Sequence, residues 1–457
     1  MSSLLRHPLT ALAGAAVLTL PWIFVWAVGG PEAVGLSTVA QVGVAGIGVL
    51  GASFLLAWGA ESAEKDVPRA FALAVLAVLA VAPEYAVDAL YAWEAGSNPG
   101  NTEAANLAIA NMTGANRILI GLGWSAIALF SIYKATRGDD VAVIDRAGTM
   151  KDAVKLDRDI STEIVFLLGA TLFAFFVPIS LSFGAANSPG LGIDAVDFVI
   201  LVGLYLTYIA VIVRGDVEEH EEQVGVPKYF HEKSRSVRIP VVLTLFTYSA
   251  FLIFTAVEPF AHGLEELGLQ LGIPRFFMIQ WFAPLASESP ELIVTAYLVN
   301  KARSTAAFNA LISSKLNQWT LLVGTLVAVY SIALGSYGVL PFDQKQAAEI
   351  WLTAAQSFFA IAILVNFNIS VREAVTLLVL FLSQVAAEFA IIQLYPEALA
   401  ETYSYWMLIG FTVLYMMLGL ALFAVRIDDT REVFRLTANR VRGRPAAADG
   451  GHESGDD

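Results

Sequence analysis

The segment Val67-Pro68-Arg69-Ala70-Phe71, followed by Ala82-Pro83-Glu84, decides the fold of this chain because it occurs twice. The second copy reads Ile273-Pro274-Arg275-Phe276-Phe277 and is followed by Ser289-Pro290-Glu291. From the loop proline to the glutamate is 16 residues in the first copy and 17 in the second. Both glutamates lie within apolar stretches, so each half of the chain places one acid inside an apolar segment.

The similarity between the halves extends beyond these segments. A polar string from Asn111 to Arg117 matches one from Asn309 to Lys315, and Gly190–Asp194 matches Asn368–Arg372. Each copy covers five apolar spans, and because five is odd the copies have opposite orientations in a membrane. Inverted repeats of this kind are typical of secondary transporters, which bind their substrate near mid-membrane where the repeats meet.

Composition indicates a membrane protein of the all-α polytopic class. Of 457 residues, 57% are hydrophobic and only 15% are charged, against about a quarter in soluble proteins. Apolar runs of about 20 residues, enough to cross the bilayer, recur throughout. We predict twelve transmembrane helices, near residues 9–28, 36–60, 69–93, 104–133, 161–184, 192–213, 239–261, 274–299, 305–334, 346–366, 372–394 and 403–426.

Orientation follows from the basic residues, which favour cytoplasmic loops. Placing both termini in the cytoplasm puts 23 of the 27 Lys and Arg residues on that side, with only Arg275 and Lys345 outside. We therefore expect a multi-pass protein of the cell membrane. Its predicted parts are an extra helix (1–35), a first repeat (36–214), a connector (215–238), a second repeat (239–395), an extra helix (403–426) and a largely disordered cytoplasmic tail (427–457).

Several function classes are excluded or disfavoured. The chain has no cysteine and five histidines, so disulfides and thiolate metal sites are excluded. A net charge of −14 argues against nucleic acid as a partner. No nucleotide-binding loop or catalytic triad suggests an enzyme, and we expect no cofactor. The expected partners are the lipid bilayer and inorganic cations.

Glu84 and Glu291 are the leading candidate ligands, since an intramembrane carboxylate costs about 3 kcal/mol or more to insert and is functional by default. The proline before each frees the carbonyl four residues back, at Leu79 and Ala286. Helical spacing brings further acids to the same face. The candidate oxygen ligands are those two carbonyls and the side chains of Glu84, Glu291, Asp88, Glu288, Ser287, Asn111, Asn309 and Asn317.

This set suits Ca²⁺, which takes 6 to 8 oxygen ligands. The acids Glu84, Asp88, Glu288 and Glu291, set against Arg117 and Lys315, leave two uncompensated negative charges, which one divalent cation neutralises. Arg117 and Lys315 are therefore candidate charge-compensating residues. Alternatively, Asp88 and Glu288 only pair with these two basic side chains.

The repeats resemble the calcium:cation antiporter superfamily, the sodium/calcium exchangers and their relatives, over roughly residues 36–395. The first copy matches at Pro83, Glu84, Asn111, Gly114 and Asn116, and the second at Ser287, Pro290, Glu291, Asn309, Ser313 and Asn317. The resemblance implies that Glu84 and Glu291 bind the transported cation, that Ser313 belongs to the site, and that alternating access exchanges the cation for Na⁺ or H⁺ as the outermost helices of each repeat slide past the core.

The chain departs from the family pattern where Na⁺ ligands are expected. Ala80 and Val81 replace a hydroxyl pair, Ala115 and Leu119 replace a serine and an asparagine, and Arg117 and Lys315 stand where the family is apolar. A fixed ammonium in place of a coupling ion favours H⁺ coupling or an altered substrate.

The function expected first is therefore antiport of Ca²⁺, or another divalent cation, for Na⁺ or H⁺. The alternatives are a transporter of the same fold with a monovalent or different substrate, and a membrane sensor that binds ions without transporting them.

Overall fold

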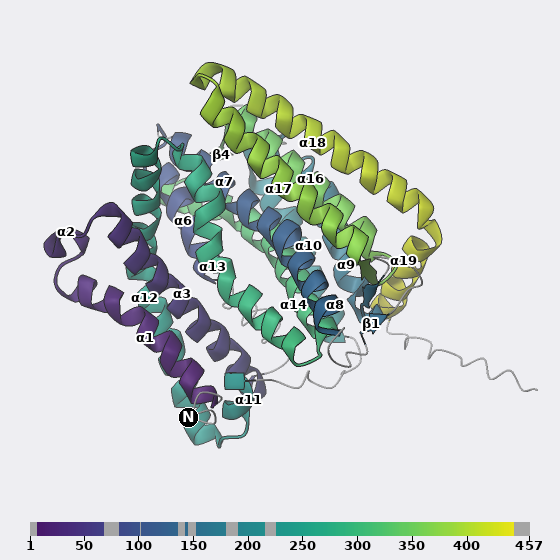
Figure 1. Ribbon diagram of the computed structural model, residues 1–457, viewed down its shortest axis with the longest axis horizontal. Helices are drawn as coiled ribbons and strands as arrows, with labels where there is room; N and C mark the ends of the chain where they lie inside the picture. The colour runs from purple at the N-terminus through teal and green to yellow at the C-terminus, as the bar shows by residue number, and fades with distance from the viewer. Residues whose placement is uncertain are drawn as a thin grey trace, which may run out of the picture.

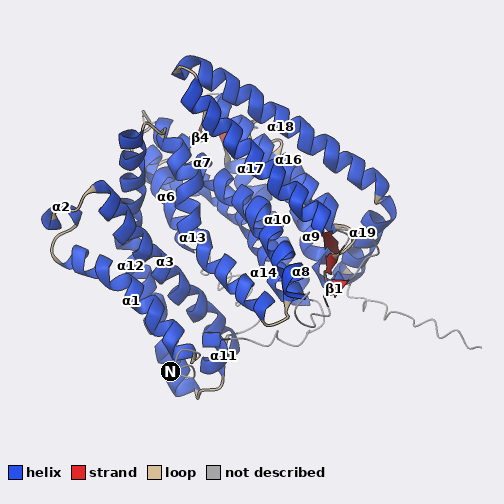
Figure 2. Ribbon diagram, viewed as in Figure 1, coloured by secondary structure: helices blue, strands red, loops and turns tan. Residues whose placement is uncertain are grey.

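A computed structural model describes residues 7–67, 82–100, 102–135, 142–144, 152–179, 191–214 and 225–442, and it is almost entirely helical (Figures 1 and 2). The longer helices are α1 (Pro8–Ala27), α3 (Thr38–Ala63), α6 (Ala82–Ser97), α7 (Thr102–Ile118), α8 (Ser125–Ala135), α9 (Ser161–Ala174), α10 (Ala195–Arg214), α12 (Arg235–Leu271), α13 (Arg275–Asn300), α14 (Ser304–Asn317), α15 (Val323–Leu334), α16 (Gln344–Leu364), α17 (Val371–Leu394), α18 (Glu397–Val425) and α19 (Ile427–Val441). Short helices are α2 (Pro31–Val34), η1 (Glu64–Asp66), η4 (Arg158–Ile160) and α11 (Gly225–His231).

Within the described residues, nine helical runs are long and apolar enough to cross a membrane. They correspond to nine of the twelve predicted spans, because α7 continues into α8 and α14 into α15. The described parts of the other three spans are α6, α9 and α13, which are too short or too polar to be counted in the same way. The prediction of an all-α polytopic membrane protein is confirmed, whereas the number twelve is not.

One pair of helix irregularities supports the repeat. A π-helical segment, η3 (Leu119–Trp124), follows Arg117 in the first half, and a second one, η5 (Gln318–Leu322), follows Lys315 in the second half. Such segments are rare and are frequently found at functional sites. Their equivalent positions support the pairing of Arg117 with Lys315 that the sequence comparison predicts.

Short strands of one half of the chain pair with short strands of the other half. Strand β2 (Ala153–Lys155), which precedes α9, pairs antiparallel with β5 (Asn368–Ser370), which precedes α17, and β1 (Val143–Ile144) extends that sheet. Strand β3 (Gly192–Ile193), which precedes α10, pairs with β4 (Leu340–Pro341), which precedes α16. Each pair thus joins the fourth helix of one repeat to the fifth helix of the other, as a pseudo-two-fold axis requires.

The long helices α3 and α12 form a separate pair (Figure 1). Helix α12 lies along α3, and α1 packs on α3 and also contacts α12, where Thr19 and Trp22 form hydrogen bonds with Tyr248 and Thr255. The bidentate pair of Arg238 with Asp66, at 2.6 and 2.7 Å, ties α12 to the end of η1. Near the opposite end, the side-chain amides of Gln41 and Gln270 donate across the pair to the Pro259 carbonyl and to the Thr38 hydroxyl. The two helices are therefore fastened at both ends.

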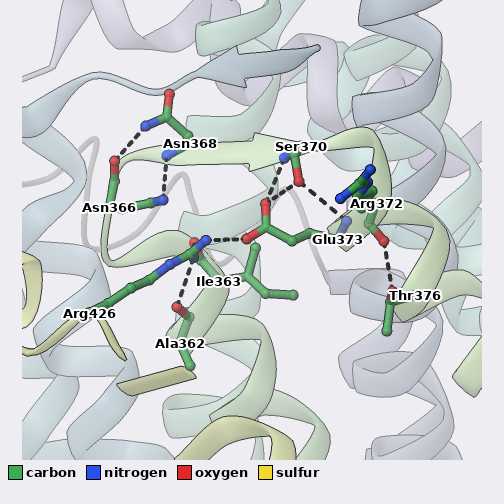
Figure 3. Close-up of polar contacts among 9 residues, drawn as sticks. All are labelled: Ala362, Ile363, Asn366, Asn368, Ser370, Arg372, Glu373, Thr376 and Arg426. Atoms are coloured by element: carbon green, nitrogen blue, oxygen red, sulfur yellow. Dashed lines mark hydrogen bonds and ion pairs between the residues drawn. The ribbon is translucent and has the colours of Figure 1, made fainter. Parts of the chain in front are cut away.

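The last helices are fastened to the second repeat through one arginine (Figure 3). Arg426, at the junction of α18 and α19, donates to the carbonyls of Ala362 and Ile363 at 3.2 and 2.6 Å and pairs with Glu373. The final carbonyls of a helix have no partner within the helix, so this guanidinium caps α16. Glu373 in turn forms a capping box with Ser370 at the start of α17.

The beginning of the C-terminal tail differs from the prediction. We predicted a largely disordered segment from residue 427, but residues 427–441 form α19, which packs on α9. Val433 and Thr437 are buried there, the Thr437 hydroxyl donates to the Ser161 carbonyl, and Arg440 pairs with Asp159 at 2.9 Å. Burial of one helix face against the repeat explains the order. Residues 443–457 lie outside the described residues.

Candidate cation-binding site

The acids of the two halves meet at one amide. Gln318, the first residue of η5, donates through Nε2 to Glu84 Oε2 at 2.7 Å and to Glu288 Oε1 at 2.6 Å. Glu84 is on α6 of the first repeat and Glu288 on α13 of the second, and both are about 1–2% exposed. The first turn of a π-helical segment therefore holds two buried carboxylates side by side.

Glu291 and its neighbours lie beside this pair. Ser314 on α14 donates to Glu291 Oε2 at 2.8 Å, and the Tyr85 hydroxyl donates to Asn317 Oδ1 at 2.8 Å. A cavity of about 310 Å³ connects them. Among the predicted site residues, it is lined by Glu84, Ser287, Glu288, Glu291, Ser313 and Asn317.

The cavity continues towards the end of α3, where Glu61 and Glu64 also line it. The basic-residue asymmetry predicts that this end of the bundle faces the cytoplasm. Neither of these two acids was among the predicted ligands.

Several buried oxygens of the cluster accept no hydrogen bond from the described residues. They are the second carboxylate oxygens of Glu84, Glu288 and Asp88 and the amide oxygens of Asn111 and Asn309. Buried acceptors without partners are uncommon in proteins, and carboxylate and amide oxygens are the ligands that Ca²⁺ prefers. The donor set therefore fits a hard divalent cation as substrate.

The remaining predicted ligands contribute in different ways. Asn111 donates to Asp88 Oδ1 at 2.9 Å, so these two side chains form a buried pair on α6 and α7 and do not line the cavity. Asn309 is partly buried and also lies off the cavity lining. Ala286 is one turn before Pro290 on α13, and the helix continues through residue 290 without a break. Leu79 lies outside the described residues.

Lys315 is fully buried close to the acids but forms no direct ion pair with them in the described part of the chain. Its ammonium donates to Asn116 Oδ1 at 2.6 Å and lies 4.4 Å from the centre of the Trp319 ring. The charges of Glu84 and Glu288 still act on it. It is therefore held by the first repeat beside the site.

Arg117 occupies the equivalent position in the first half but faces elsewhere. It pairs with Glu349 on α16 at 2.5 Å, with both side chains about 0–1% exposed, and donates to Gln384 on α17. The Trp281 ring packs on its guanidinium at 4.7 Å. The expectation that Arg117 compensates the charge of the cation site is not supported by this geometry, because a carboxylate on another helix already neutralises it. The alternative that Asp88 and Glu288 form direct ion pairs with Arg117 or Lys315 is likewise not observed.

A glycine sets the crossing of the two helices that carry these groups. At Gly114 on α7, an added Cβ would lie 1.8 Å from the Gln280 carbonyl oxygen on α13. Only a residue without a side chain permits this approach. The close contact brings the polar string of the first repeat against the Pro-Glu helix of the second.

Besides Glu61 and Glu64, four uncharged side chains that contact the site were not among the predicted ligands. Gln318 and Ser314 bind carboxylates directly, and Tyr205 and Tyr208 of α10 line the cavity. Ser314 lies within the polar string that was identified and Gln318 lies three residues after its end, so extending that string was the available signal. The tyrosines come from a helix with no motif, and only the fold brings them to the cavity.

The family model described as "Sodium/calcium exchanger protein" matches residues 37–214 and 241–390. Among solved structures, the crystal structure of the H⁺/Ca²⁺ exchanger CAX is 39% identical, with a TM-score of 0.79, and the match covers 95% of this chain and 98% of that one. The structure of native YfkE is 14% identical, with a TM-score of 0.53 and coverage of 83% and 98%, and it shows the fold alone. Comparison with curated protein sequences finds no match.

Proposed function

The chain belongs to the sodium/calcium exchanger protein family, and from that membership we propose that it exchanges Ca²⁺ for H⁺ at the Glu84, Glu288 and Glu291 carboxylates. It is a polytopic membrane antiporter of cations. The observation that carries the proposal is the pair of carboxylates, one from each repeat, held on the single amide of Gln318 beside a cavity of about 310 Å³.

Calcium is the substrate that the donor set favours. Three carboxylates, the hydroxyls of Ser287 and Ser313 and the amide of Asn317 surround one cavity, and this all-oxygen set suits a cation that takes 6 to 8 ligands at flexible geometry. The 39% identical relative is named an H⁺/Ca²⁺ exchanger. The Asp88–Asn111 pair supplies a further carboxylate behind Glu84.

Charge supports H⁺ rather than Na⁺ as the counter-ion. Glu84, Asp88, Glu288 and Glu291 lie near one ammonium, Lys315, because Arg117 is neutralised by Glu349. If all five groups are ionised, four negative charges and one positive charge leave three, which one Ca²⁺ and one proton neutralise. Two positions that offer Na⁺ a hydroxyl or amide oxygen in the family are here buried and apolar, at Ala115 and Leu119.

Transport then follows from competition for the same oxygens. Ca²⁺ reaches the carboxylates from the side of Glu61 and Glu64 and displaces their protons, and the site then opens to the opposite side. A carboxylate buried in a low-dielectric environment is unstable as a bare anion. The site therefore changes the side to which it is open only when its carboxylates hold either Ca²⁺ or protons. Because the empty anionic site cannot make this change, the two fluxes are coupled.

Flux into proteoliposomes tests the proposal. Purified protein is reconstituted, and ⁴⁵Ca²⁺ uptake is measured under an imposed pH gradient and, separately, under a Na⁺ gradient at equal pH. We expect uptake driven by the pH gradient and little by the Na⁺ gradient. Uptake driven only by Na⁺ would contradict H⁺ coupling, and absence of Ca²⁺ flux with retained Ca²⁺ binding would indicate a sensor.

The site assignment needs matched variants. Glu84→Gln and Glu291→Gln keep the size of the side chain but remove a charge, and each should abolish uptake. Glu401→Gln, at an exposed position on α18, should leave uptake unchanged. Normal uptake in both site variants would refute the assignment.

A further inference from the structure

A second cluster of charged side chains lies at the end of the bundle opposite Glu61 and Glu64. His262 on α12 lies 3.0 Å from Glu94 Oε1 on α6 through Nε2, and 3.1 Å from Glu265 Oε1 through Nδ1. The Tyr91 hydroxyl donates to the same Glu265 oxygen at 2.8 Å. His262 thus joins the α3–α12 pair to a helix that carries the cation site.

Both imidazole nitrogens face carboxylate oxygens, which accept but do not donate. A neutral imidazole has one donor and one acceptor nitrogen, whereas the protonated ring has two donors. The two contacts can therefore both be hydrogen bonds only when the ring carries a proton and a positive charge. Loss of that proton turns one contact into a repulsive one.

A second contact strengthens the same junction. Arg275 at the start of α13 pairs with Glu103 on α7 at 3.2 Å and lies 3.8 Å from Glu265 on α12. A cavity of about 730 Å³ lies among these side chains, on the side where Arg275 is predicted to be outside the cell. The charged or titratable groups facing His262 are Tyr91 and Glu94 of α6, Glu103 of α7, Glu265 and Glu266 of α12, and Arg275 of α13, and the facing end of α3 contributes Thr38 and Gln41.

The position of this junction gives it a role in the transport cycle. Helices α3 and α12 are fastened to one another at both ends, so they can move only together relative to α6, α7 and α13. In this structure the cavity at the carboxylates extends to Glu61 and Glu64, and the His262 contacts hold the other end together.

We propose that His262 is a proton-operated latch of the outer gate, a positioning residue that holds the gate closed when protonated and releases it when neutral. This role rests on the proposed H⁺/Ca²⁺ exchange. A proton arriving from outside after Ca²⁺ release would close the gate and return the carboxylates to the cytoplasmic side.

Cysteine labelling tests the latch without transport, because the chain contains no cysteine. Ala108 on α7 is fully buried between the outer cavity and Asn111, and Ala108→Cys reports opening from outside. A second chain carrying Leu269→Cys, at an exposed position in the outer cavity, corrects for the pH dependence of thiol reactivity. Proteoliposomes are treated with a membrane-impermeant maleimide at fixed inner pH, with outer pH at about 5.5 or about 8, either side of the histidine range.

The normalised labelling rate at Ala108→Cys should rise about fivefold from the acidic to the alkaline bath, the shift that one partly exposed ion pair can support. Adding His262→Gln should make the rate high at both pH values. As a control, His231→Gln should keep the pH response. Burial lowers the pKa of the His231 imidazole, which faces the Glu61 carbonyl at the other end of α3.

A labelling rate that does not change with outer pH, or a pH response that persists in His262→Gln, would overturn the latch. Leu107→Cys, one residue away and also buried, replaces the reporter if Ala108→Cys does not fold. Because labelling requires no Ca²⁺ flux, a failed latch and a failed exchange function are distinguishable.

Discussion

Gln318 donates its side-chain amide to Glu84 at 2.7 Å across the interface between the two repeats. The same nitrogen donates to Glu288 at 2.6 Å. In this arrangement an uncharged donor keeps two buried carboxylates together, at the place where a cation would bind them more strongly. The two repeats therefore share one polar centre.

Replacing Gln318 by Leu should destabilise the cation-free protein more than the Ca²⁺-loaded protein. The substitution leaves two buried carboxylates without a donor, which costs about 1–3 kcal/mol. We expect a lower melting temperature without Ca²⁺ and a larger increase on adding Ca²⁺ than in the parent protein. Thermal unfolding in detergent measures both, and an equal Ca²⁺ response in variant and parent would argue against the shared centre.

Removing Arg117 alone should be far more harmful than removing it together with Glu349. Arg117→Met leaves the Glu349 charge buried and unpaired, a loss of about 3–5 kcal/mol, whereas Arg117→Met combined with Glu349→Met approaches neutrality. The melting temperatures of the two single variants and the double variant measure the coupling.

Transport by the same double variant tests whether Arg117 only stabilises the fold or also contributes to the cation site. Because Arg117 faces α16 and α17, the double variant should keep the ion selectivity of the parent. A changed selectivity would return Arg117 to the cation site.

Lys315→Met should change the ions that drive Ca²⁺ uptake. When protonated, the Lys315 side chain beside Glu84 and Glu288 compensates one carboxylate, so its loss requires another monovalent cation, H⁺ or Na⁺, in the cycle. We expect either a steeper dependence of uptake on the pH gradient or the appearance of Na⁺-driven uptake. Ca²⁺ uptake measured under a pH gradient and under a Na⁺ gradient distinguishes these outcomes. An unchanged dependence of uptake on both gradients would show that Lys315 is only structural.

Much of the architecture could be predicted because the Pro-Glu copies and the apolar runs depend on local sequence. The spans, the inverted repeat and the acids Glu84 and Glu291 follow from those patterns. The partner of Arg117 could not be predicted in this way, because Glu349 lies on a helix more than two hundred residues away in the sequence. Nevertheless, Glu349 falls within a predicted span, and the rule applied to Glu84 also identifies it as an intramembrane acid.

Two further differences have physical causes. A basic helix within residues 431–444 was expected to lie on anionic lipid, but its packing on α9 was not predicted, because the charged composition hides a narrow apolar stripe around Val433 that becomes buried only when α9 is present. The π-helical segments that bring Gln318 to the carboxylates depend on tertiary packing. No local motif specifies where a helix inserts such a turn.

Counting protons released when Ca²⁺ binds tests the central claim most directly. The purified protein in weakly buffered detergent solution, near pH 7, is titrated with Ca²⁺ while a dye reports released H⁺. Competition for the same carboxylates predicts that binding releases protons, and that Glu84→Gln and Glu291→Gln lose both the binding and the release. Tight Ca²⁺ binding with no proton release, or unchanged binding in both variants, would contradict it.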